Sequence, residues 1–288
     1  MSQQQREDEA MPYVLSDAEV EQMHRDGYVC PIDVLDESEA LALRSELEAV
    51  ETRLGGPLSG HQRNKTHLLL KWLDDLIRDA RVLDPLEQIL GPNILCWNTI
   101  FWTKEAGSNS FVSWHQDTRY WGLSSDNVMT AWLALSPASI DSGCMRVMPG
   151  THLGDVLPHE DRYHQDNMLT RGQEISKGVD EDVAVFMPLK TGQMSIHNYR
   201  IAHASGPNLS PDRRIGISMH FMPTETKQIV GDWDTAALVR GRDDYGYFRP
   251  TMSPAADFDD EAVEFHAAAT AQLSKVLYEG ATQNTAKL

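Results

Sequence analysis

The most restrictive feature of this 288-residue sequence is a series of short β-forming segments between Ile94 and Pro223. Each is rich in β-branched or aromatic residues and is bounded by Gly, Pro, Asn or Asp, which is typical of short strands joined by turns. The predicted strands are 94–104, 110–117, 128–135, 144–148, 183–187, 193–197, 200–205 and 214–222. So many short strands in about 130 residues favour an antiparallel sandwich or barrel.

Helices are predicted on both sides of this β region. Ser16-Asp17-Ala18-Glu19 has the form of a capping box opening a helix that ends near Gly27, and "YVCPIDVL" follows as a strand. An amphipathic helix starts near Asp36 or Ser38 and stops at Gly55. Further helices are expected around 69–77, 84–90 and 257–280. The predicted fold class is therefore mainly β with flanking α-helices.

The chain, 1–288, is predicted to be one domain, because it contains no internal repeat, linker or low-complexity tract. Its expected parts are a disordered lead (1–12), a mainly helical N-terminal support (13–92), a catalytic β core (93–223) and a C-terminal segment with a helix (224–288). Residues 154–182 are polar and irregular. A connection of that length inside a compact domain is usually a functional lid or insertion.

Charge and cysteine content limit the partners and the compartment. The formal net charge is −18, and such an acidic surface repels phosphates and anionic lipids, so neither nucleic acid nor membrane is expected to bind. Cys30, Cys96 and Cys144 lie far apart, which argues against a disulfide framework. The N-terminus lacks the apolar region of a signal peptide. We therefore expect a cytoplasmic protein, as a monomer or homodimer.

Candidate metal chemistry begins in "SWHQD", where His115 and Asp117 are two residues apart in a predicted strand. Side chains alternate along a strand, so these two are expected to share a face and to converge on one ion. A second histidine would complete the facial triad of non-haem Fe(II) oxygenases, which leaves coordination positions open. The His-x-Asp pattern alone also suits a hydrogen-bonded surface pair.

The candidates for the second histidine are His197, His203 and His220. After His203, the turn "GPNLSPD" joins two apolar runs and predicts a hairpin. With a loop at 207–212, Ser205 would lie opposite Arg214 and on the same face as His203. A slip of one residue would turn Arg214 to the other side.

A guanidinium beside a metal has a definite chemical use. A five-carbon keto diacid can chelate the ion through one end, and Arg214 could hold the distal carboxylate with two hydrogen bonds. Ser205 could add a hydroxyl donor. An isolated arginine of this kind is otherwise most often exposed and paired with a carboxylate.

Together, these motifs resemble the phytanoyl-CoA dioxygenase family. The resemblance covers about 65–223 and rests on His115-x-Asp117, then "GCMRVMPGTH" (143–152), then "HASGPNLSPDRR" (203–214). Family members are Fe(II)- and 2-oxoglutarate-dependent oxygenases with a double-stranded β-helix, a cupin-like jelly roll. The resemblance therefore implies His115, Asp117 and His203 as iron ligands, and it implies Arg214, Ser205, Trp132 and Lys65 around 2-oxoglutarate.

The reaction implied by the resemblance uses O2 and 2-oxoglutarate to hydroxylate, desaturate or cyclise a substrate at a C–H bond, with succinate and CO2 as products. Halogenases of this wider group lack the carboxylate ligand, so Asp117 disfavours halogenation. The alternatives are a cupin-like metal-dependent hydrolase or isomerase with the same His/Asp/His set, and a binding barrel without activity. The hydrolase or isomerase would not need an inward Arg214, and intact metal ligands with a cosubstrate arginine argue against the binding barrel.

The expected substrate is a small organic molecule, such as a secondary-metabolite intermediate. Coenzyme A thioesters are not carried over from the family, because they add several negative charges to a strongly acidic chain. Tyr120 and Trp121, directly after the metal segment, are predicted to line the substrate pocket, although such aromatic residues are as often packed core. In "VRGRDDYGYF", Arg240, Arg242 and Tyr245 are predicted to approach the pocket.

Overall fold

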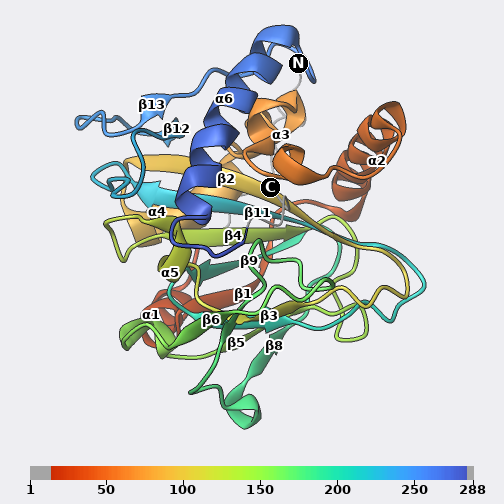
Figure 1. Cartoon of the computed structure of the whole chain (residues 1–288), viewed down its shortest axis with the longest axis vertical. Helices are drawn as coiled ribbons and strands as arrows, with labels where there is room; N and C mark the ends of the chain where they lie inside the picture. Colours follow the sequence, from red (N-terminus) through yellow and green to blue (C-terminus); the bar gives the residue numbers. More distant parts are fainter. Residues whose placement is uncertain (1–13, 284–288) are drawn as a thin grey trace, which may run out of the picture.

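The computed structural model describes residues 14–283 and contains two mainly antiparallel sheets that face each other (Figure 1). The predicted lead, 1–12, lies outside the described residues. The larger sheet has the order β1-β9-β4-β11-β2-β12-β13, and the smaller one has the order β3-β10-β5-β8. Hydrogen bonds do not close the described strands into a barrel. This arrangement confirms the mainly β, jelly-roll fold class.

The strands of the larger sheet are β1 (Tyr28–Asp33), β2 (Ile94–Lys104), β4 (Met129–Ala134), β9 (Gln193–Asn198), β11 (Arg214–Pro223), β12 (Thr235–Arg240) and β13 (Arg249–Pro250). Those of the smaller sheet are β3 (Val112–His115), β5 (Met145–Met148), β8 (Val185–Met187) and β10 (Ala202–Ser205). The helices are α1 (Asp17–Asp26), α2 (Glu37–Leu54), α3 (Lys71–Leu76), α4 (Ala80–Leu90), α5 (Thr118–Trp121) and α6 (Asp260–Leu277). Short 3-10 turns are η2 (Gly60–Arg63), η3 (Thr66–Leu68), η4 (Thr151–Leu153) and η5 (Glu181–Val183).

Local capping explains why α1 begins and ends where the sequence predicts. The Ser16 side chain accepts a hydrogen bond from the backbone N–H of Glu19, and the Glu19 carboxylate accepts one from the backbone N–H of Ser16. Gly27 then ends the helix with φ 84°, a left-handed conformation that glycine adopts readily. Asp36, Glu39 and Gly55 do the same for α2.

The two faces of β11 differ in character because successive side chains point to opposite sides. Ile215, Ile217 and Met219 belong to the apolar core that the larger sheet forms with α2, α3 and α4. Burying each such side chain contributes about 1.5–3 kcal/mol. The alternate residues face the smaller sheet, and this polar face carries the candidate site.

The predicted hairpin between 200–205 and 214–222 is wrong. β10 pairs with β3 and β5 in the smaller sheet, whereas β11 pairs with β2 and β4 in the larger one. The connecting loop is held by Asn208, whose Nδ2 donates to the carbonyls of Lys104 and Asp212 at 3.0 and 2.8 Å. The turn residues therefore carry the chain from one sheet to the other, and they do not decide which strands pair.

The segment 154–182 is not wholly irregular. It contains a two-stranded sheet of β6 (His159–Asp161) and β7 (Gln173–Ile175). This small sheet lies beside β3, where the Ser113 hydroxyl donates to the Gln173 carbonyl. The segment is thereby held against the strand that carries His115.

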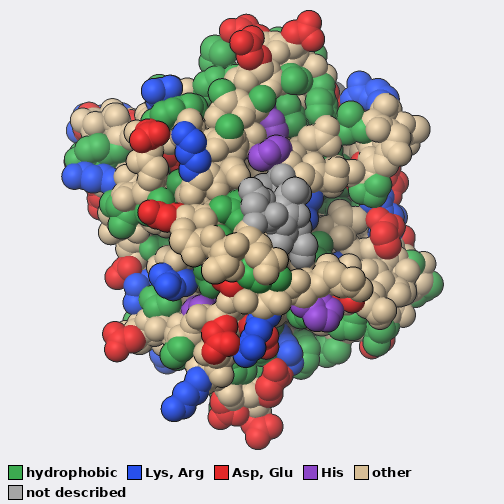
Figure 2. Space-filling view, in the orientation of Figure 1, with side chains coloured by type: hydrophobic (Ala, Val, Ile, Leu, Met, Phe, Trp, Pro, Cys, Tyr) green, Lys and Arg blue, Asp and Glu red, His purple; other side chains and the backbone are tan. Residues whose placement is uncertain are grey.

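The C-terminal helix α6 covers one end of the molecule. In Figure 1 it crosses the view over the strands of the larger sheet. Its Leu273 and Leu277 pack with Trp97 of β2 and Trp121 of α5. No helix within 14–283 has both the length and the apolar character needed to cross a bilayer. Acidic and basic side chains are scattered over the face shown in Figure 2.

Candidate metal centre and cosubstrate pocket

Three side chains meet between the two sheets. His115, Asp117 and His203 each offer a ligand atom, and these atoms lie within 4.8 Å of one another. The distance from Asp117 Oδ1 to His115 Nε2 is 3.3 Å, and that from Asp117 Oδ2 to His203 Nε2 is 3.9 Å. His115 on β3 and His203 on β10 are direct cross-strand partners. The structure thus brings together the three residues that the sequence singled out.

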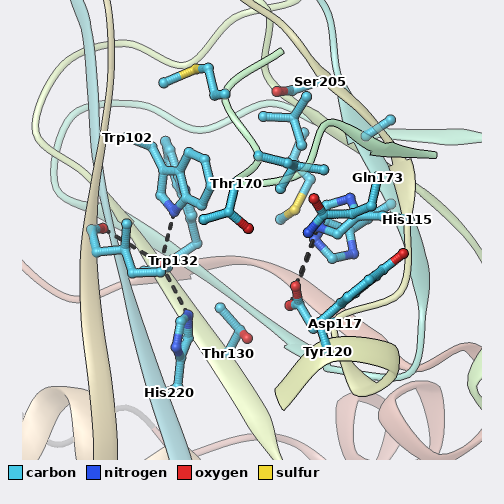
Figure 3. A pocket seen from close by; sticks show the side chains of 18 of the residues that line it. Trp102, His115, Asp117, Tyr120, Thr130, Trp132, Thr170, Gln173, Ser205 and His220 are labelled. Carbon is cyan, nitrogen blue, oxygen red and sulfur yellow. Dashed lines mark hydrogen bonds and ion pairs between the residues drawn. The ribbon is translucent and has the colours of Figure 1, made fainter. Parts of the chain in front are cut away.

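Asp117 reaches the cluster by a route that the strand argument missed. β3 ends at His115, and Asp117 has the helical angles φ −60° and ψ −36° at the start of α5. The chain therefore turns directly after His115, and strand alternation does not place the carboxylate. Figure 3 shows the Asp117 carboxylate next to the His115 ring.

The hydrogen bonds of both imidazoles leave their Nε2 atoms free to bind a metal. His115 Nδ1 lies 2.9 Å from the Ser113 carbonyl, and His203 Nδ1 lies 3.0 Å from the Ile201 carbonyl. A carbonyl oxygen only accepts, so each Nδ1 carries the hydrogen and each Nε2 presents a lone pair. Two such imidazoles and one carboxylate fit the donor set that suits Fe(II) in a facial triad.

Electrostatics keep two of these ligands in the form that a metal requires. Burial alone would raise the pKa of Asp117, but the contact with the His115 imidazole and the nearby His203 lower that pKa to about 2. Burial, helped by His115, lowers the pKa of His203 to about 4. At neutral pH Asp117 is therefore ionised and His203 is uncharged.

A pocket lies beside these residues, between the two sheets. In Figure 3, Trp102, Trp132 and His220 form one wall, and Tyr120 and Gln173 lie on the metal-site side. Asp117 is the only carboxylate among the described residues that line the pocket, whereas Arg63 and Arg214 both line it. The pocket is therefore locally basic in a protein of strongly negative net charge.

Arg214 is buried in this pocket without a carboxylate partner among residues 14–283. Its Nη1 donates to the Gly143 carbonyl at 2.8 Å, and its guanidinium lies 5.3 Å from the centre of the Trp132 ring. Its Nε is buried and has no hydrogen-bond partner in the described chain. Burial lowers the pKa of Arg214 to about 10, so it stays charged at neutral pH.

Ser205 and Trp132 also line the pocket, as the sequence predicts for cosubstrate residues. The ring of Trp132 lies directly against β11 because position 216 is glycine. A Cβ there would be 1.9 Å from the Trp132 ring. The Ser205 hydroxyl accepts a hydrogen bond of 2.8 Å from Lys104, a buried residue that the sequence reasoning did not single out.

The prediction for Lys65 needs correction. Its Nζ lies 3.1 Å from Asp234 and donates to the carbonyls of Trp97 and Thr235, so it is fully buried away from the pocket. Arg63, two residues earlier at the end of η2, lines the pocket instead, with its guanidinium 5.3 Å from the Trp102 ring. A basic residue near this position was expected, but the path of the loop decided which one faces inward.

Of the predicted substrate residues, Tyr120 and Trp121 line the pocket, and Trp121 packs 4.4 Å from the His220 ring. Arg242 and Tyr245 do not. The Arg242 side chain, in the loop after β12, is 79% exposed and pairs with Asp244. Tyr245 is 50% exposed and stacks on a neighbouring tyrosine.

Arg240 is likewise absent from the pocket. It forms ion pairs with Asp84 and Glu87 of α4 and so joins β12 to that helix. The remaining histidine candidates, His197 and His220, do line the pocket but lie outside the three-residue cluster. Burial lowers the pKa of His220 to about 4 and that of His197 well below its usual value, so both are uncharged at neutral pH.

The predicted lid segment forms part of the pocket wall through Met168, Leu169, Thr170 and Gln173. The sequence reasoning missed its partner, Leu277 at the end of α6, which also lines the pocket. Arg171 joins the two. Its Nε donates to the Leu277 carbonyl at 2.7 Å, and its Nη2 donates to the Glu279 carbonyl at 2.5 Å.

The sequence profile of the phytanoyl-CoA dioxygenase (PhyH) family matches residues 23–216. The chain belongs to this family. A probable alpha-ketoglutarate-dependent hypophosphite dioxygenase of Stutzerimonas stutzeri is 27% identical, over 57% of this chain and 58% of that protein. The peroxisomal phytanoyl-CoA dioxygenase of Homo sapiens is 28% identical, over 51% and 45%. The chain thus spans about half the length of these curated family members.

The similarity to solved structures covers more of both chains than the similarity to these curated proteins does. The apo form of the non-heme monooxygenase ThoJ is 33% identical, covers 90% of this chain and 97% of its own, and superposes with a TM-score of 0.79. The nickel complex of ThoJ is 31% identical, with coverages of 88% and 96% and a TM-score of 0.74. The fold shared with ThoJ therefore extends over most of the molecule.

Proposed function

We propose that this chain is a non-haem Fe(II)- and 2-oxoglutarate-dependent oxygenase that oxidises a C–H bond of a small organic substrate. The observation that carries the proposal is the meeting of His115, Asp117 and His203 beside Arg214, a buried guanidinium with no carboxylate partner within 14–283. A metal-dependent hydrolase would need the three metal ligands but not the buried guanidinium of Arg214.

The two histidines and Asp117 are proposed to hold the iron. When bound, Fe(II), 2-oxoglutarate and O2 supply an oxidant able to attack unactivated C–H bonds, with succinate and CO2 as by-products. The carbonyls of Ser113 and Ile201 fix both imidazoles, so Nε2 points inward before any metal arrives. The ionised Asp117 completes a ligand set with one negative charge.

Arg214 and Ser205 are proposed to bind the distal carboxylate of 2-oxoglutarate, with Trp132 packing alongside. A planar guanidinium can donate two parallel hydrogen bonds to a carboxylate, and Nε of Arg214 is available for one of them. Arg63 takes the place predicted for Lys65 as the other cation of this pocket. The rest of the cavity is left for the substrate.

The substrate is proposed to be a small organic molecule, such as a secondary-metabolite intermediate, bound near Tyr120 and Trp121. Met168 and Leu169 of the lid segment and Leu277 of α6 supply apolar cover on the other sides. Their proposed task is to exclude water and to hold one C–H bond near the metal, because a reactive oxidant needs positioning more than recognition.

Formation of succinate from 2-oxoglutarate, with Fe(II) and O2, tests this proposal. Replacing Arg214 with Ala should lower the rate at limiting 2-oxoglutarate about 100-fold, since two charged hydrogen bonds of about 1.5 kcal/mol each are lost. Arg213→Ala is the matched control, because its guanidinium pairs with Glu51 and Glu105 and does not line the pocket. Absence of succinate, or equal rates for both variants, would favour the hydrolase or isomerase.

A further inference from the structure

Two buried basic residues lie side by side, and one of them, Arg214, lines the pocket. Lys104 on β2 and Arg214 on β11 are direct cross-strand partners, and they are 0% and 3% exposed. Neither has a carboxylate within ion-pair distance in the described part of the chain. Lys65 offers the contrast, because it is just as deeply buried but is paired with Asp234 at 3.1 Å. The fold neutralises one buried lysine and leaves the other without a counter-charge.

The contacts of Lys104 point toward the pocket. Its Nζ donates to the Ser205 hydroxyl at 2.8 Å and also to the backbone carbonyl of Gly206. Because the Ser205 oxygen accepts from Lys104, the hydrogen of that hydroxyl is directed to a different acceptor. Ser205 lines the pocket, as Arg214 does. Lys104 thus converts Ser205 into a donor facing the same space as the guanidinium.

The charge balance of this region favours an anion. Moving an ammonium group out of water costs several kcal/mol unless an opposite charge accompanies it. Burial and the neighbouring Arg214 lower the pKa of Lys104 to about 6, and Cys144, the other titratable group near it, acts in the opposite direction. A carboxylate bound between Ser205 and Arg214 would supply the missing negative charge.

We propose that Lys104 is a positioning residue for the cosubstrate, which aims the Ser205 hydroxyl at the distal carboxylate of 2-oxoglutarate and adds a second positive charge beside Arg214. The inference rests on the proposed function and deepens it. It makes the site selective for dianionic 2-oxo acids. A five-carbon 2-oxo acid that ends in a methyl group, 2-oxopentanoate, would leave both cations unmatched.

A double-mutant cycle tests the link between Lys104 and Ser205. The dissociation constant of 2-oxoglutarate is measured by calorimetry without O2 on Fe(II)-loaded wild type, Lys104→Met, Ser205→Ala and the double variant. Each single change should weaken binding about 10-fold, for one charged hydrogen bond. The double variant should be little weaker than Lys104→Met, since the residues act together. Full multiplication of the two effects, or unchanged binding in Lys104→Met, would overturn the proposal.

Kinetics and stability separate positioning from a purely structural role. Lys104→Met should raise the KM for 2-oxoglutarate about 10-fold and leave kcat within about 2-fold, with 2-oxopentanoate bound equally weakly by both proteins. Removing a buried amine that has no counter-charge should not lower the unfolding free energy. If Lys104→Met unfolds, Lys104→Arg, which keeps the charge, replaces it and should retain most of the affinity. A less stable variant with unchanged KM would show a structural role only.

A pH profile gives a readout that packing would not move. Lys104 must gain a proton when the dianion binds, so wild-type affinity for 2-oxoglutarate should fall as the pH rises from 6 to 9. Lys104→Met should flatten this slope, whereas an unchanged slope would contradict the proposal. Arg214→Ala keeps the two proposals apart. If neither Arg214→Ala nor Lys104→Met weakens 2-oxoglutarate binding, the oxygenase assignment fails. If Arg214→Ala weakens binding and Lys104→Met does not, only the proposed role of Lys104 fails.

Discussion

The two faces of the larger sheet come from the same strands but differ in character: one packs an apolar core, and the other lines a polar pocket. On the helix side, Ile215, Ile217 and Met219 of β11 are buried among apolar neighbours. On the pocket side, the alternate residues include His220 and Arg214, which are equally buried yet keep polar atoms without partners in the described chain. Stability therefore resides on one face, and the other face is free to hold unmatched polar groups for ligands.

The largest expected effect comes from breaking the site on the pocket side. Asp117→Ala removes the anionic ligand, and succinate formation should fall by more than about 1000-fold. Mutating a residue that only hydrogen-bonds to a metal ligand already lowers metal affinity or activity about 10–100-fold. The unfolding free energy of the metal-free protein should fall only modestly, because the carboxylate packs no core and loses only the contacts with His115 and His203 that lower its pKa. Anaerobic iron titration and urea unfolding measure the two quantities. Retained iron binding would argue against this ligand set.

The mirror change is Ile217→Ala on the helix side of the same sheet. It leaves a cavity in the core and should lower the unfolding free energy by about 3 kcal/mol. Activity per folded molecule should stay within about 2-fold of wild type, because Ile217 does not line the pocket. Urea denaturation and succinate formation at low temperature test both parts. A large loss of activity in the folded variant would mean that the faces are coupled.

Gly216→Ala tests how closely the pocket face is packed. Its Cβ would overlap the Trp132 ring, so we expect a cost of about 2 kcal/mol in stability and a raised KM for 2-oxoglutarate as the ring moves. Gly206→Ala is the matched control, because a Cβ at that position has no atom within 4 Å. Steady-state kinetics of both variants should differ, and equal KM values would place Trp132 outside the cosubstrate site.

Acid should affect the pocket face more than the helix face. Burial lowers the pKa of His203 and His220 to about 4, whereas an unfolded histidine titrates near 6.5. Each histidine therefore stabilises the metal-free protein fully above about pH 6.5, and this contribution is lost at up to about 1.4 kcal/mol per pH unit as the pH falls toward 4. His220→Phe should make the decline shallower by that amount. Urea unfolding at pH 7, 6 and 5 measures it, and a pH-independent stability would contradict the assignment.

Much of the local structure was predictable, because neighbouring residues determine it. The capping pair Ser16 and Glu19 and the terminator Gly27 set α1 to within a residue. The strands of 94–104 and 214–222 were placed almost to their ends, since their composition and flanking turns are local signals. Among the site residues, His115, Asp117, His203 and Arg214 were all anticipated, and all four meet in one pocket.

Other features depend on contacts between distant segments. Asp234, about 170 residues later in the sequence, forms an ion pair with Lys65 and holds it away from the pocket, so Arg63 lines the pocket instead. The hydrogen bond between Lys104 and Ser205 depends on β10 and β11 belonging to different sheets, because this arrangement brings Ser205 next to the end of β2. The expected hairpin failed for the same reason.

The sequence by itself determined the short strands, the capped helices and the residue types of a His/Asp/His site, because backbone preferences and side-chain chemistry act over a few residues. Only the tertiary structure decided which strands pair, how Asp117 turns toward His203, and which buried basic residue has no carboxylate partner among 14–283. Those outcomes depend on contacts between groups that are far apart in the sequence. Which strands share hydrogen bonds and which charges pair is decided only when the two sheets pack against each other.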